Sequence, residues 1–167
     1  LVQDAAYSTL LRGRRQQIHG RIASVFEERF QDIVQTHPEL LAHHYTEAGN
    51  LEAAIPAWLS AGRRALERSA LAEAVAQFRK GLTLLCGMPG DTWRRQELDL
   101  SVALGRALIA TQGHASPATG EAYARARELS EKLNRPPQFV PVLYGQCVHH
   151  LMRAELEVAR THAREMQ

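Results

Sequence analysis

Aromatic residues are scarce in this sequence, and so are the alternating patterns from which β-strands are built. Only 6% of the 167 residues are Phe, Trp or Tyr, whereas 45% are hydrophobic and most of these are Ala and Leu. Ala and Leu favour helices, while strands are enriched in β-branched and aromatic residues at every second position. The sequence therefore predicts an all-α fold.

Cysteine is nearly absent, and no long hydrophobic run interrupts the chain. The two cysteines, Cys86 and Cys147, belong to no metal-binding or redox motif and form no disulfide framework, which favours a reducing compartment. No apolar stretch has the length of a membrane span, and the first residues lack a signal-peptide pattern. We therefore expect a cytoplasmic protein that has no membrane partner.

An excess of charge of one sign is also missing, because the formal net charge is only +2. Four arginines lie close together near the start of the chain, at Arg12, Arg14, Arg15 and Arg21. Nucleic-acid-binding surfaces combine such charge with a recognisable motif or stacking aromatics, which this segment lacks. These arginines are expected to form a solvated helix face, and we predict no nucleic-acid partner.

Motifs for catalysis are absent. The sequence has no phosphate-binding loop, no dinucleotide-binding glycine pattern and no nucleophile elbow. His43 and Glu47 lie one helical turn apart, and Cys147 precedes His149 and His150. Adjacent histidines on a helix point about 100° apart, whereas a metal ion needs converging ligands. We expect no enzymatic activity, no cofactor and no metal in this chain.

The stretch 41–85 contains the most informative pattern. It predicts three helices, separated by a Gly49-Asn50 turn and by a break near Ser69. Five of its residues follow a helix-pair pattern of an aromatic residue, a turn glycine, a small residue, a bulky aromatic and another small residue: Tyr45, Gly49, Ala54, Trp58 and Ala61. This spacing resembles the tetratricopeptide (TPR) repeat. The proline that usually ends that repeat is missing, and Pro56 lies inside the second helix.

A second resemblance concerns the beginning of the chain. The segment LVQDAAYSTLLRGRRQQIHGRIA is similar to the region that follows the nucleotide-binding module in bacterial STAND-type ATPases. In that family the region leads into TPR-like repeats and joins the ATPase to class III adenylate/guanylate cyclase domains or LuxR-type DNA-binding domains. The resemblance implies that any ATPase site lies before Leu1. Since the chain also begins without methionine and ends in an amphipathic run, we expect a fragment of a longer protein.

Together these patterns predict about 7–9 helices in a right-handed, TPR-like solenoid of antiparallel pairs. Residues 1–36 would be N-terminal helices that close a winged-helix or linker region, and 37–167 would be TPR-like repeats. The stripe Ile18, Ile22, Val25 and Phe26 should face inward, and the apolar segment 139–151 should be buried. Further helices are expected over 39–48, 51–68, 72–85, 91–111 (capped by Asp91 or Thr92) and 117–133.

We expect the chain to be a non-catalytic scaffold for protein–protein contact that regulates a signalling ATPase, a cyclase or a transcription regulator. Solenoids suit this role because stacked helices form an extended groove. Residues near the repeat seam are the expected partner contacts: His44, Tyr45, Asn50, Arg63 and Arg64. Exposed terminal helices would also permit weak self-association.

Two other functions stay open. The chain could be a small-molecule sensor, with an effector held in an apolar pocket lined by Trp58, Tyr123 or Tyr144. It could instead be a structural spacer between an ATPase and an output domain, with neither ligand nor partner.

Overall fold

The computed structural model describes residues 12–166, and within that range the protein contains nine α-helices and no strand. The prediction of an all-α fold is therefore confirmed. The segment before Arg12, on which part of the family resemblance rests, lies outside the described residues. The helices are α2 (Arg12–Arg29), α3 (Gln31–Thr36), α4 (Pro38–Ala48), α5 (Leu51–Glu67), α6 (Leu71–Leu85), α7 (Asp91–Gln112), α8 (Pro117–Lys132), α9 (Phe139–Met152) and α10 (Leu156–Glu165).

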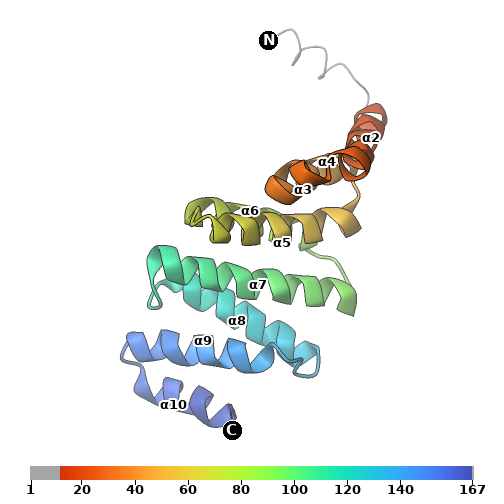
Figure 1. Ribbon diagram of the computed structural model, residues 1–167. Coiled ribbons are helices and arrows are strands. Elements are labelled where there is room, and N and C mark those ends of the chain that lie inside the picture. The colour runs from red at the N-terminus through yellow and green to blue at the C-terminus, as the bar shows by residue number, and fades with distance from the viewer. Residues whose placement is uncertain (1–11, 167) are drawn as a thin grey trace.

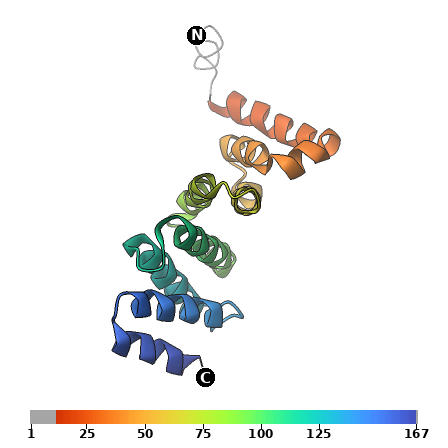
Figure 2. The ribbon, with the colours of Figure 1, turned by 60° about the vertical axis from the view of Figure 1, so that its left-hand side comes forward.

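The helices form an elongated array, with α2 at one end and α10 at the other (Figures 1 and 2). Most contacts join helices that are neighbours in the chain, and the further contacts of α2 with α4 and of α5 with α7 each skip one helix. The boundary expected at residue 36 is bridged by the packing of α2 on α4. None of the helices in the described range is both long and apolar enough to cross a membrane.

The turns of the stretch 41–85 form as the sequence predicts. Gly49 ends α4 in the left-handed conformation with φ of 77°, and the Asn50 side chain accepts a hydrogen bond from the backbone N–H of Ala53. Ser69 and Ala154 also have positive φ, of 59° and 61°. Each follows the end of a helix, at a position where glycine would adopt this conformation with less strain.

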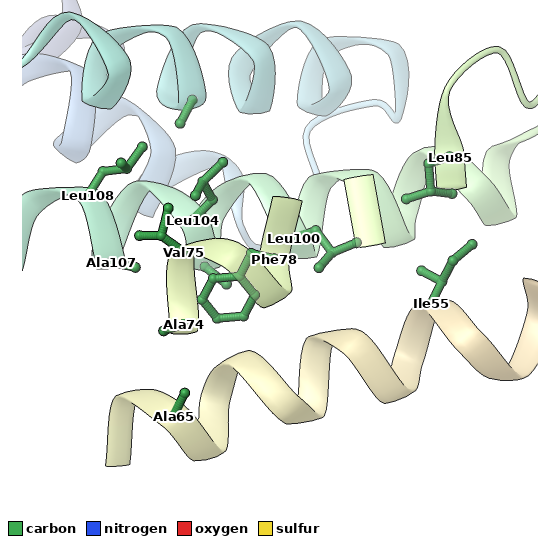
Figure 3. Close-up of a cluster of buried hydrophobic side chains, with 12 residues drawn as sticks. Ile55, Ala65, Ala74, Val75, Phe78, Leu85, Leu100, Leu104, Ala107 and Leu108 are labelled. Carbon is green, nitrogen blue, oxygen red and sulfur yellow. The ribbon is translucent and has the colours of Figure 1, made fainter. Parts of the chain in front are cut away.

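Small residues let the helices approach closely. Ala54 and Ala61 are buried beside Trp58, whose Nε1 donates a hydrogen bond of 2.9 Å to Thr46 Oγ1 on α4. The ring of Phe78 on α6 fills the space beside Gly62 of α5. Figure 3 shows Phe78 in the main core cluster, together with side chains from α5 and α7. These contacts hold successive helices together through closely packed clusters of buried side chains.

Three expectations about single elements are wrong. Ile18 and Val25 are exposed (38% and 43%), because α4 packs on the face of α2 that carries His19 and Ala23. The α7 helix starts after Gly90 without a side-chain cap, since Asp91 is already helical and accepts a hydrogen bond from Arg94.

The third correction concerns segment 139–151, which is only half buried. Phe139, Val142 and Leu143 lie in the core, whereas Val140 and Tyr144 are 52% and 62% exposed. α9 packs against both α8 and α10, and Val140 and Tyr144 lie on a face that neither of these helices covers.

Candidate binding surface

A groove between α7 and α9 forms an apolar hollow on the described part of the chain. We call it the α7–α9 groove. Its volume is about 530 Å³. In Figure 1, α8 lies between α7 and α9. The residues that line it are Val102, Arg106, Ile109, Tyr123, Val140, Pro141, Tyr144 and Met166.

Tyr123 of α8 lies at the base of this groove and is only 4% exposed. Its ring fits between two helical glycines, Gly105 of α7 and Gly145 of α9. A Cβ atom at either position would come within 2.9 Å and 2.4 Å of the ring, respectively. Real Cβ atoms essentially never approach so closely, so the two glycines are what allows the ring to enter.

The residues of each wall lie on one face of a helix. Val102, Arg106 and Ile109 follow one another at i, i+4 and i+7 on α7, and Val140 and Tyr144 at i and i+4 on α9. Pro141 stands in the first turn of α9, where the missing N–H costs no helix hydrogen bond. One side of the groove therefore presents aliphatic and aromatic surface directly to water.

Two polar groups interrupt this apolar lining. Arg106 is exposed, and its guanidinium forms no hydrogen bond or ion pair with the residues that the structure describes. The Tyr123 hydroxyl likewise forms no hydrogen bond with these residues. Burial raises the pKa of Tyr123, and the nearby charge of Arg106 opposes that rise. Two hydrogen-bond donors thus stand unused in an apolar groove.

The predicted contacts His44 and Tyr45 lie elsewhere, in the packing of α4 against α2. The Nδ1 atoms of His44 and His19 are 2.9 Å apart, so one ring donates a hydrogen bond to the other. Burial and a hydrogen bond to Glu27 raise the pKa of Tyr45 to about 12. Both side chains serve the helix interface.

The remaining predicted contacts occupy the two ends of α5. Asn50 caps its start, while Arg63 and Arg64 lie near its end, about 20 Å further along at 1.5 Å per residue. Arg64 pairs with Glu67 at 2.9 Å, and both arginines border a separate hollow of about 450 Å³ that includes Gln35 of α3. The structure does not bring the five predicted residues into one surface.

Several histidines and one of the cysteines form hydrogen bonds within the chain. No group of three or more His, Cys, Asp or Glu side chains within residues 12–166 is arranged to hold a metal ion. His149 Nδ1 donates to the carbonyl of His114 at 2.6 Å, and His150 Nδ1 pairs with Glu155 at the same distance. The thiol of Cys147 donates to the Ala159 carbonyl. These bonds join α9 to the segments beside it.

Tyr123 and Tyr144, two of the three residues predicted to line an apolar pocket, both line the α7–α9 groove. Trp58, the third candidate, is buried in the contact between α4 and α5. Arg106 and Val140 were missed. Their helical spacing to Ile109 and Tyr144 was readable, but the spacing does not say which helix face stays uncovered.

Comparison with known proteins supplies one relative. No protein-family model and no solved structure matches the chain. Over 149 residues, or 87% of its length, the chain is 31% identical to an uncharacterized protein of Rhizobium meliloti (strain 1021). The chain spans only 14% of that protein, so the similarity concerns one segment of a much longer polypeptide.

Proposed function

We propose that this chain is a non-catalytic scaffold that binds a protein partner and thereby regulates a larger signalling protein. The observation that supports this function most directly is the open α7–α9 groove, whose walls expose Val140 and Tyr144. Exposed apolar surface on a soluble protein is typical of interaction sites. In an elongated array of helices, binding in such a groove can bias how neighbouring helices pack.

We further infer a right-handed, TPR-like solenoid, of the kind found in STAND-type ATPases of cytoplasmic signalling systems. The buried small residues Ala54 and Ala61, the Gly49 turn and contacts that mainly join chain neighbours support the repeat. The much greater length of the Rhizobium relative is compatible with a segment of a multidomain protein. In the protein that contains this segment, its regulatory targets would be adjacent domains, with weak self-association as a further contact.

A selection experiment tests the scaffold function. A displayed library of helical peptides is selected on the immobilised chain and then on a Val140→Asp, Tyr144→Asp variant. We expect enriched peptides that lose binding to this variant. The matched control changes two exposed apolar residues outside the groove, Ile33→Asp and Leu40→Asp, and should bind like the wild type. The proposal would be contradicted if no peptides were enriched, or if the enriched peptides bound the groove variant and the control variant equally well.

A small-molecule sensor is the second candidate, and the size of the groove favours it. Its volume of about 530 Å³ lies within the ~300–1,000 Å³ typical of ligand sites, and two tyrosines line it. A ligand that binds only the folded state raises the melting temperature. Thermal denaturation with a library of metabolites should then find stabilising compounds, and the Tyr144→Asp variant should abolish their effect.

A further inference from the structure

The α7–α9 groove combines apolar walls with two free donors, and this combination defines the chemistry of its occupant. The ring of Tyr123 is held in a buried position by Gly105 and Gly145, whereas its hydroxyl, which has no hydrogen-bond partner among the described residues, reaches the surface of the groove. This hydroxyl can therefore donate a hydrogen bond to a polar group that enters the groove.

The positive charge of Arg106 indicates that the polar group bound in the groove is negatively charged. Two arginines of α7 and α8 have carboxylate partners: Arg94 pairs with Asp91, and Arg125 pairs with Glu97 and Glu128. Arg106 has none within residues 12–166, although it lies on the same helix as Glu97 and lines the groove beside Tyr123. A guanidinium only donates hydrogen bonds, and a phenol hydroxyl can donate as well as accept, so both groups can donate to one carboxylate.

The shape of the groove decides between a peptide and a small acid. Small ligands usually bury 70–90% of their surface or more. Here Val140 and Tyr144 are more than half exposed, so one wall stands open to water. A segment of polypeptide that covers these side chains from outside fits this surface better than an enclosed molecule.

We infer that the α7–α9 groove binds an amphipathic peptide segment whose aliphatic side chains pack on Val140 and Tyr144 and whose Asp or Glu carboxylate accepts hydrogen bonds from Arg106 and Tyr123. This inference rests on the proposed scaffold function and names the partner chemistry. It separates the roles of the two kinds of residue. The apolar wall supplies most of the affinity, and the two donors supply selectivity for an acidic side chain.

The test uses two labelled probes that differ in one residue. Both are alanine-based helical peptides with leucines at i, i+3 and i+7, and the residue at i+4 is Glu in one and Gln in the other. Their affinities for the chain are measured by fluorescence anisotropy. We expect the Glu probe to bind wild type about ten- to a hundredfold more tightly, which is the range of a hydrogen-bonded charge.

Substitutions of Arg106 and Tyr123 test whether these two donors cause the preference for the Glu probe. Arg106→Gln should bring the affinity for the Glu probe down to that for the Gln probe, and the replacement leaves the core intact because Arg106 is exposed. Tyr123→Phe keeps the ring between the glycines and should reduce the preference by a smaller factor. The control Arg95→Gln removes the same charge from an exposed position of α7 outside the groove, and it should keep the wild-type preference.

Three results would overturn the inference. Equal affinity of wild type for both probes would mean that the groove recognises apolar segments without a carboxylate, a result that leaves the scaffold function standing. Binding of neither probe would exclude this partner chemistry. Stabilisation by decanoic acid that depends on Arg106, without peptide binding, would replace the peptide with a free aliphatic acid and favour the sensor function.

Discussion

Tyr123 of α8 and Gly145 of α9 are in such close contact that a Cβ atom at Gly145 would lie 2.4 Å from Tyr123 Cε1. Gly145→Ala must therefore displace the ring or the helix. Overpacking of this kind costs about 1–3 kcal/mol, more than the ~0.5–1 kcal/mol that alanine gains over glycine in a helix. We predict a net loss of unfolding free energy, measured by urea denaturation followed by circular dichroism.

Gly20→Ala is the matched control, because a Cβ atom there meets only Ala48 at an ordinary distance of 3.8 Å. It should stabilise the chain by about 0.5–1 kcal/mol. If Gly145→Ala were equally stabilising, the close contact between α8 and α9 would be wrong.

The hydroxyl of Thr46 connects two helices. It accepts a hydrogen bond from Trp58 Nε1 at 2.9 Å and donates one to the Ala42 carbonyl at 2.8 Å. Thr46→Val would leave the buried indole N–H unpaired, at a cost of about 1–3 kcal/mol in unfolding free energy. Thr83→Val is the control, since the exposed Thr83 hydroxyl bonds only to its own helix, at the Arg79 carbonyl. Equal midpoints of urea denaturation for both variants would refute the prediction.

Stability should decrease when the solution is acidified below about pH 6.5. Burial, and then the charges of Arg127 and His150, lower the pKa of His162 from its ordinary value of 6.5, while Glu165 opposes them. His162 Nδ1 accepts a hydrogen bond from Arg127, which only the neutral ring can do. Because the unfolded state binds the proton more readily, the contribution is complete above 6.5 and is lost as the pH falls toward the lowered pKa.

The melting temperature measured between pH 7.5 and pH 5 tests this linkage. His162→Gln keeps a side-chain acceptor for Arg127 but cannot titrate, so its melting temperature should depend less steeply on pH than that of wild type. His37→Gln, at an exposed histidine, serves as the control and should follow the wild-type curve. Parallel curves for wild type and His162→Gln would show that another group is responsible.

Arg127 attaches α10 to the rest of the array. It donates to His162 Nδ1 and to Glu165 Oε2, both at 2.8 Å, while α10 packs mainly against α9. Arg127→Met should weaken this attachment by about 1 kcal/mol and raise amide hydrogen exchange in α10. Arg160→Met is the control, because Arg160 pairs only with Glu157 within α10. Unchanged exchange in Arg127→Met would mean that apolar contacts alone hold α10.

Local features of the fold were predictable because they depend on residues close together in the chain. The left-handed Gly49 and the Asn50 cap follow from the conformational preferences of single residues, and the structure contains both. The Asp91 cap failed for an equally local reason, since Gly90 preceded it with a φ of 112° and helix formation began at Asp91 itself.

Prediction of the candidate site was weaker. The five expected contacts were chosen from polar residues near the repeat seam, yet His44 and Tyr45 are engaged with α2, and Arg64 pairs with Glu67. Sequence periodicity shows that a helix has an apolar side, but an apolar side can be covered or open. The groove at Val140 and Tyr144 could be recognised only once the neighbours of α9 were known.

The sequence by itself determined that the chain is helical and where most helices begin and end, because helix propensity, capping and turn glycines act within a few residues. The tertiary structure decided which faces meet. It turned His19 rather than Ile18 toward α4, placed Tyr123 between Gly105 and Gly145, and left Arg106 without a partner in the described range. Such choices depend on contacts between residues far apart in the chain, where packing and burial outweigh local preference.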